Sequence, residues 1–452
     1  MTKPVRAGMV LTIVVALAGA LLLPAAPAAA KPGAPSHAPF EKRDNIRITK
    51  NEEFTAENGV RSGSGTVADP YVISGWDLNR VEIKDTSAVY SFVDNHVRGQ
   101  VILNWTGPGL VMQRNTVNDL RVNQNVRRTG DMTSGIISNN IFGIVGQLRH
   151  FDGFFEMNRV GAPGTESQRA VNFDGFNGAY FRYNTLYGYL EARLHGHHHS
   201  SSFEDDEVSH YHGPAGHHPP ESGEPPAPME DGMDHSQRYH RVFIHDNDIH
   251  STTTYALRYT DTNHAANDRT AASEQNPKLN DPHIHYTRVF IENNDLIGSG
   301  LWIDVFNAVD KQKHQGTTRG LVDVRNNTIS VGREGSFPLF PPQFQGIVVQ
   351  KAVDMTVNIA DNEITGPPED DSMLASAGRM FESPTVGIQL RDLDTGEIFI
   401  ERNSIYRYDI GVEAARFTAS VRWVISDLKT KSVGRAVEYD PNNVPNEPEQ
   451  RP

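Results

Sequence analysis

One pattern of apolar and polar positions recurs ten times along this chain, and each copy ends near an asparagine. The pattern reads apolar-any-apolar-any-any-Asn-any-apolar, and its clearest copies lie at 242–249, 289–296, 322–329, 357–364 and 398–405. Alternating apolar residues predict a short strand with every second side chain facing inward. An Asn at the strand end favours a tight turn, because Asn tolerates left-handed backbone and bonds its own turn.

The looser copies lie closer together and indicate the length of one repeat. Their asparagines are 18 to 26 residues apart, and they are Asn95, Asn115, Asn140, Asn158 and Asn184. Self-similarity at about 20–25 residues is typical of a solenoid. Asn side chains on successive coils can also bond to one another as a ladder. We therefore predict an all-β, single-stranded parallel β-helix over 46–437, rather than a leucine-rich horseshoe.

A second alternating segment follows the later Asn turns. These segments are 188–194, 255–261, 300–306, 346–352, 387–393 and 411–417. If Leu257, Ile303, Val349 and Leu390 face inward, their sequence neighbours face outward. Successive coils lie about 4.8 Å apart, so the outward residues stack. The resulting polar stripe is expected to contain Glu191, Arg193, Arg258, Asp304, Gln350, Arg391 and Glu413.

The ends of the chain and its composition further narrow the class of protein to which it can belong. Residues 1–30 are typical of a signal peptide: Lys3 and Arg6 precede an apolar stretch too short for a membrane span, and an Ala-rich cleavage site follows. We expect 31–45 to be a linker, 438–452 a disordered tail, and the mature protein a secreted monomer with no membrane span. The chain has no Cys, which excludes disulfides and thiol nucleophiles. Its net charge of −14 argues against nucleic acid as a partner.

A histidine-rich insertion explains the gap of 63 residues between Asn184 and Asn247. Residues 195–240 contain ten His, six Pro and nine acidic residues without apolar periodicity, which predicts a long disordered loop. The segments 262–286 and 307–319 are expected at the same corner of the next coils. Imidazole clusters suit a divalent transition metal, zinc or copper. The candidate ligands are His195, His197, His198, His199, His210, His212, His217, His218, His235, His240, His264 and His285.

The repeat, together with the opening segment GSGTVADPYVISGWDL at 63–78, resembles a known group of proteins. It is similar to secreted and periplasmic right-handed parallel β-helix proteins: NosD-like, carbohydrate-binding and sugar-hydrolase proteins. The resemblance covers roughly 46–437. It implies a right-handed coil and a groove that holds a polysaccharide. It also implies a link to copper handling, because NosD-like proteins are associated with copper-site maturation.

Asp281-Pro282-His283 is similar to a motif of mannuronan epimerases, which carry Asp-Pro-His before a coil of this kind. The resemblance implies that Asp281 and His283 belong to a proton-transfer site. Lys278 stands three positions before Asp281. Abstraction of the proton alpha to a uronate carboxylate needs a base and a cation, and Arg258 or Lys278 could supply the cation.

A different reading of the same stripe is glycoside hydrolysis by paired carboxylates from Asp174, Glu191 and Asp304. Trp302 and Tyr259 could stack on sugar rings or simply cover the sheet. The catalytic candidates are Asp281, His283, Arg258 and Asp304, and the substrate-binding candidates are Glu191, Arg193, Trp302, Gln350 and Arg391.

Two functions stay open at this point. The first is a secreted protein that binds, and as a lyase or epimerase processes, a polysaccharide along the stripe. The second is an extracellular metal-handling protein for which the solenoid is a scaffold and the histidine-rich loop is the binding element. The sequence leaves open whether the protein is an enzyme.

Overall fold

The computed structural model describes ten stretches of the chain. They are 40–106, 109–123, 135–151, 153–175, 179–195, 238–262, 285–306, 320–332, 344–367 and 384–451. The chain separates into two units, 1–39 and 40–452, and all described residues belong to the second. The predicted signal peptide and the predicted linker up to residue 39 therefore lie outside the described residues, as does most of the histidine-rich insertion.

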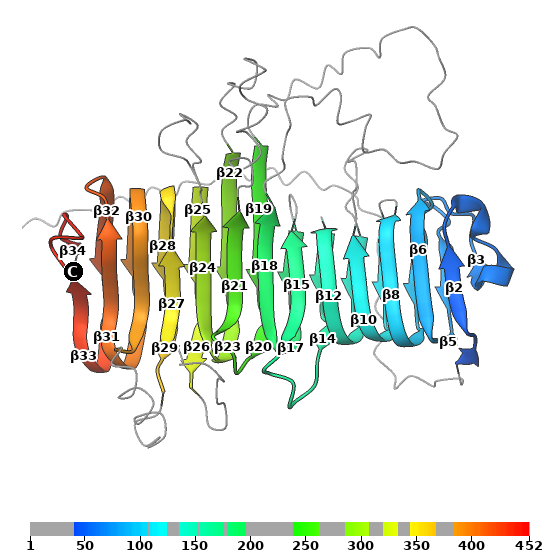
Figure 1. Cartoon of the computed structure of the whole chain (residues 1–452), viewed down its shortest axis with the longest axis horizontal. Helices are drawn as coiled ribbons and strands as arrows, with labels where there is room; N and C mark the ends of the chain where they lie inside the picture. The colour runs from blue at the N-terminus through cyan, green and yellow to red at the C-terminus, as the bar shows by residue number, and fades with distance from the viewer. Residues whose placement is uncertain are drawn as a thin grey trace, which may run out of the picture. The chain divides into compact units, whose positions relative to one another are not determined.

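The second unit is an all-β, solenoid-like stack of coils with long parallel sheets (Figure 1). In a typical coil, β22 (His285–Glu292) leads through an Asn turn into β23 (Asp295–Gly298) and β24 (Gly300–Phe306). Each of these strands pairs in parallel with its counterpart one coil later: β25 (Gly320–Arg325), β26 (Thr328–Val331) and β27 (Gln345–Gln350). The strands before the Asn turns form sheet B, and those after the turns form sheet A.

The remaining strands repeat this arrangement. Besides β22 and β25, sheet B contains β3 (Val60–Ser62), β4 (Tyr71–Ser74), β7 (Tyr90–Val93), β9 (Leu110–Gln113), β11 (Gly135–Ser138), β13 (Gly153–Glu156), β16 (Ala179–Arg182), β19 (Arg238–His245), β28 (Val353–Ala360), β32 (Val421–Ser426) and β34 (Glu449–Arg451). Besides β23, β24, β26 and β27, sheet A contains β1 (Glu41–Lys42), β2 (Asn45–Ile48), β5 (Trp76–Leu78), β6 (Arg80–Thr86), β8 (His96–Thr106), β10 (Thr116–Asn123), β12 (Ile141–Phe151), β14 (Arg159–Val160), β15 (Arg169–Gly175), β17 (Thr185–Tyr187), β18 (Tyr189–His195), β20 (Asp248–His250), β21 (Tyr255–Thr262), β29 (Glu363–Thr365), β31 (Ser404–Phe417) and β33 (Lys429–Tyr439). The strand β30 (Val386–Glu401) pairs in sheet A through its first half and in sheet B through its second half. Two short 3-10 helices, η1 (Asn51–Glu53) and η2 (Ala56–Asn58), lie near the first coil.

The core is a continuous apolar column inside the coils. Leu257, Ile303, Val349 and Leu390, which were predicted to face inward, are completely buried. In sheet B the inward positions are the first and third residues of the repeat pattern, such as Val289 and Ile291. This alternation is the expected one for strands with one face on a core.

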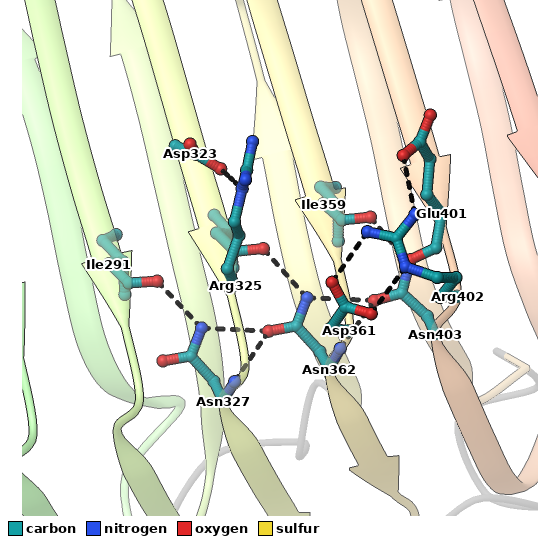
Figure 2. Close-up of polar contacts among 11 residues, drawn as sticks. Ile291, Asp323, Arg325, Asn327, Ile359, Asp361, Asn362, Glu401, Arg402 and Asn403 are labelled. Atoms are coloured by element: carbon teal, nitrogen blue, oxygen red, sulfur yellow. Dashed lines mark hydrogen bonds and ion pairs between the residues drawn. The ribbon is translucent and has the colours of Figure 1, made fainter. Parts of the chain in front are cut away.

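A ladder of ten buried asparagines connects the coils. Each is 0–2% exposed, and they are Asn95, Asn115, Asn140, Asn158, Asn184, Asn247, Asn294, Asn327, Asn362 and Asn403. In each of the first nine, the main-chain N–H and the Nδ2 donate to the Oδ1 of the Asn in the next coil, over 2.9–3.2 Å. Figure 2 shows the section from Asn327 to Asn403, in which Nδ2 also donates to a carbonyl of the preceding coil, as Asn327 does to Ile291.

The prediction that the ladder asparagines themselves adopt the left-handed conformation is wrong. The left-handed residue is the one before each ladder Asn, with φ of 52–58° at all ten positions, for example Asn293 and Asp361. Six of these ten residues are Asp or Asn, the residue types that tolerate this conformation best. At the ladder position the amide group itself is needed, because only a side chain with both a donor and an acceptor can continue the chain of hydrogen bonds.

The ends of the coil stack also differ from expectation. The residues 438–452 were predicted to be a disordered tail, yet β34 pairs with β32 and Val444 is buried. The Nε1 of Trp423 donates to the carbonyl of Asn446 at 2.7 Å. At the other end, β1 falls within the predicted linker and pairs with β5. The high content of Pro, Asn and Glu near the C-terminus reflects turns and exposure rather than disorder.

Replacement of Asn327 by Ala tests the ladder. The change leaves the main-chain N–H of Asn294 and the carbonyl of Ile291 without their buried partners. We expect the free energy of unfolding to fall by roughly 1–3 kcal/mol, the cost of unsatisfied buried polar groups. Denaturant titration measures it, and Asn79→Ala at an exposed position is the control. Equal stability of both variants would contradict the structural role of the ladder.

Candidate functional site

The outward face of sheet A carries two rows of polar side chains in register. In the first row Glu191, Arg258 and Trp302 occupy paired positions on β18, β21 and β24. The second row lies two residues further along each strand and continues over more coils. Its members are Arg193, Thr260, Asp304, Gln350 and Arg391. The structure therefore brings all seven described candidates for catalysis and substrate binding onto one surface, which we call the polar face.

Glu191 is the best-supported carboxylate of the polar face. Its side chain is only 7% exposed, and it accepts from Arg169 Nη1 at 2.9 Å and from Arg193 Nη2 at 2.6 Å. Burial alone would raise the pKa of this carboxyl, but the hydrogen bonds and charges of the two guanidinium groups lower its pKa below the ordinary value. Glu191 is thus held as a carboxylate, suited to accept hydrogen bonds and not to donate a proton.

Asp304 lies between two cations two coils further along. Its oxygens are 3.7 Å from Arg258 Nη2 and 3.8 Å from Lys351 Nζ, and its side chain is 8% exposed. The Oδ1 of Asp304 is buried without a hydrogen-bond partner within the described part of the chain. The guanidinium of Arg258 also lies over the ring of Tyr255, 5.6 Å from its centroid. These cations are close enough to neutralise Asp304 but too far for direct hydrogen bonds.

The structure corrects one expectation about the polar face and adds one residue to it. Tyr259 was considered an aromatic that could stack on a sugar, but it is completely buried, because it pairs with Ile303 and faces the core. Gln389 was not among the residues predicted for this face; it is 1% exposed and donates to Glu413 on the next strand. Trp302 is half-buried and faces outward as expected.

Several predicted residues lie outside the described residues. Among the catalytic candidates these are Asp281, His283 and Lys278. Among the predicted metal ligands they are His197, His198, His199, His210, His212, His217, His218, His235 and His264. The third carboxylate of the hydrolase alternative, Asp174, lies on β15 in register with Arg193.

Three predicted ligands lie in strands that border the insertions. His195 ends β18, His240 belongs to β19 and His285 begins β22, so the predicted insertion of 195–240 is shorter at both ends than expected. Three insertions, 196–237, 263–284 and 307–319, start after β18, β21 and β24, which are neighbours in sheet A. The chain continues after them with β19, β22 and β25, which are neighbours in sheet B. Within the described ranges, no three His, Asp or Glu side chains are grouped so that they could hold a metal ion.

Sheet B carries an aromatic stack that the sequence reasoning missed. Phe154, Tyr180, Phe243 and Phe290 occupy successive coils, with ring centroids 4.6–5.0 Å apart and nearly parallel planes. The signal was present, because each ring occupies the second position of its repeat pattern. Since the ring faces are covered by one another, the stack presents edges and stabilises sheet B more than it offers a platform for a ligand.

Beyond this stack, sheet B carries charged residues at the strand ends. Arg402 donates to both oxygens of Asp361 at 2.8 Å and to Glu401 at 3.1 Å (Figure 2). Two coils before Arg402, Arg325 donates to Asp323 on its own strand. Burial and the charge of Asp323 raise the pKa of Glu292 in this region. A surface pocket opens beside Arg325 and Arg402.

Comparisons with known proteins do not assign this chain. No family model, no curated protein and no solved structure matches it. Among the described residues, no helix has the length and apolar character needed to cross a membrane.

The ion pairs of Glu191 predict a pH dependence of stability. The pKa of Glu191 is lower in the folded protein than in the unfolded chain, where it has its ordinary value of 4.5. The contribution of Glu191 to folding stability is therefore fully present above pH 4.5, and it disappears as the pH falls through the pKa of the folded state. At pH 7 we expect the free energy of unfolding of Glu191→Gln to be roughly 1–3 kcal/mol lower than that of the unchanged protein. On acidification to about pH 3, the free energy of unfolding should fall less in the variant than in the unchanged protein. Thermal unfolding across this range measures both effects.

The control for this experiment is Glu397→Gln. Among the described residues Glu397 forms one ion pair, an exposed one with Arg422, and such pairs contribute about 0–1 kcal/mol. If both variants show the same acid dependence, the two guanidinium groups do not stabilise the Glu191 carboxylate.

Proposed function

We propose that this protein is a secreted, right-handed parallel β-helix that binds an acidic polysaccharide along the polar face of sheet A. The observation that carries the proposal is that two cations flank each of the two buried carboxylates. Glu191 is shared by Arg169 and Arg193, and Asp304 by Arg258 and Lys351. Each of these carboxylates is therefore flanked by two cations, although the chain as a whole carries −14.

The chemistry of a uronate polymer fits this arrangement. Guanidinium groups bind carboxylates through paired N–H donors, and Arg258 and Arg391 face the same surface. Trp302 supplies a flat apolar surface against the ring of a sugar. The buried carboxylates of Glu191 and Asp304 can accept hydrogen bonds from hydroxyl groups. Repetition of coils at about 4.8 Å suits a linear polymer that lies across several coils.

Turnover of the polymer is the second part of the proposal, and it depends on Asp281 and His283. The segment that carries them joins β21, on which Arg258 lies, to β22, which begins at His285. In this mechanism His283 removes the proton alpha to the uronate carboxylate, and Arg258 neutralises the enolate that forms. Lyase action then expels the 4-linked sugar, whereas epimerase action returns a proton to the opposite face. Glycoside hydrolysis is less well supported, because the lowered pKa of Glu191 does not suit a general acid.

Metal handling is a second candidate function, and the shared attachment of the insertions favours it. The segments 196–237, 263–284 and 307–319 join strands that are neighbours in both sheets, and they contain His-rich sequence. A zinc or copper ion bound by imidazoles from these segments would be compatible with polymer binding.

Binding assays with alginate, pectate and a glucuronan test the main proposal. We expect Arg258→Ala and Trp302→Ala each to weaken binding of the preferred polymer about tenfold or more, equal to about 1.4 kcal/mol. The control is Arg114→Ala, an exposed arginine paired with Asp94 away from the polar face. His283→Ala should abolish formation of an unsaturated product or exchange of solvent deuterium, with binding retained. Binding that survives both changes on the polar face would overturn the proposal.

Calorimetric titration with zinc and copper tests the second candidate. Only neutral imidazole binds a metal, so the affinity should be much weaker at pH 5.5 than at pH 7.5, on either side of the ordinary histidine pKa of about 6.5. Deletion of 197–235 should remove most of the bound metal. Equal affinity at the two pH values, or an unchanged affinity after the deletion, would contradict a histidine site in the insertion.

A further inference from the structure

A small pocket on sheet B lies apart from the polar face. Its volume is about 90 Å³, and it is lined by Arg325, Asn358, Ala360, Phe399, Glu401 and Arg402. The pocket exists because Ala360 is paired between Arg325 and Glu401 on neighbouring strands. A long side chain at this outward position would occupy the space that the methyl group leaves open.

Phe399 gives the pocket an apolar wall. It occupies the same row as the aromatic stack, in register with Asn358 and, one coil further back, with Asp323. Each ring of the stack packs against another ring, but among the described residues no aromatic ring packs against Phe399. The replacement of aromatic residues by Asp323 and Asn358 therefore ends the stack and leaves Phe399 beside a pocket.

The other walls supply both donors and acceptors. Arg325 donates to Asp323 through its Nε, and within the described ranges its Nη groups make no hydrogen bond. The amide of Asn358 adds a donor and an acceptor, and Glu401 uses Oε2 for Arg402. An aromatic wall combined with donors and acceptors at one rim is the arrangement that a sugar ring requires, with its apolar face and its ring of hydroxyl groups.

The charge around the pocket selects a neutral ligand. Its two guanidinium groups, of Arg325 and Arg402, are bonded to three carboxylates, those of Asp323, Asp361 and Glu401. These five groups together carry a charge of −1, and the carboxyl group of Glu292 lies beside Asp323 and Arg325. On the polar face, by contrast, two cations flank each buried carboxylate. A uronate would be repelled here, whereas hydroxyl groups could bond to both signs of charge.

We infer that this pocket binds a single neutral pyranose unit, independently of the polymer on the polar face. The two sites would bind different sugars, an acidic one on sheet A and a neutral one on sheet B. The inference does not require the proposed polymer site to be correct, because it rests on Ala360, Phe399 and their polar neighbours alone.

Ligand-detected NMR with the full chain tests the inference. The probes are glucose, galactose, mannose and N-acetylglucosamine at about 1–10 mM, the weak range expected for a single sugar. Glucuronate and galacturonate are measured in parallel. We expect at least one neutral sugar to bind more tightly than both uronates. Ala360→Leu, which fills the pocket, and Phe399→Ala, which removes its apolar wall, should each weaken that binding by about tenfold or more.

Two controls separate this site from the polar face. Arg422→Ala removes an exposed arginine that bonds Glu397 and Glu449 on sheet B outside the pocket, and it should leave sugar binding unchanged. Trp302→Ala should also leave it unchanged. If Ala360→Leu destabilises the coil, the inference is judged from Phe399→Ala and from the additional variant Asn358→Ala. Absence of binding by every neutral sugar, preference for a uronate, or loss of binding only in Trp302→Ala would overturn the inference.

Discussion

The asparagine ladder is the interaction on which the rest of this structure depends. A buried amide costs free energy unless its donors and acceptor are satisfied. Here each ladder Asn between Asn95 and Asn403 is satisfied by the coil before it and the coil after it, as Asn294 is by Asn247 and Asn327. A coil that shifted by one residue would leave amides of two neighbours unpaired. The ladder therefore fixes the register, and the register determines which outward side chains meet.

The ladder also explains how the chain accepts long insertions. Asn184 and Asn247 are separated by 63 residues, yet their side chains bond at 3.0 Å in the same way as the closer pairs. The insertion leaves from the end of β18 and returns at the start of β19, away from the Asn turn. Closing a longer loop costs little more entropy than closing a short one. Sequence can therefore be added at this corner without disturbing the stacked coils.

The two outer faces differ in how they compensate charge. On sheet A, Glu191 and Asp304 are each surrounded by two cations, and the bonds to Glu191 are strong enough to outweigh its burial. On sheet B, Arg402 is bonded to two carboxylates. Because the same backbone repeat supports both faces, the difference comes entirely from residues at outward positions. Such positions are not constrained by the core, which leaves them available for recognition.

The sequence by itself determined the strands, the turns and the inward residues, because these follow from local alternation and from the Asn at each strand end. It also predicted the outward stripe from Glu191 to Arg391, since alternation specifies which side of a strand a residue faces. It could not determine which outward residues become neighbours, because coils of unequal length intervene between them. The burial of Glu191, the pocket beside Ala360 and the pairing of β34 with β32 all depend on contacts between coils. The left-handed residue before each ladder Asn likewise became evident only in the folded chain, where the amide is committed to its neighbours and the preceding residue makes the turn.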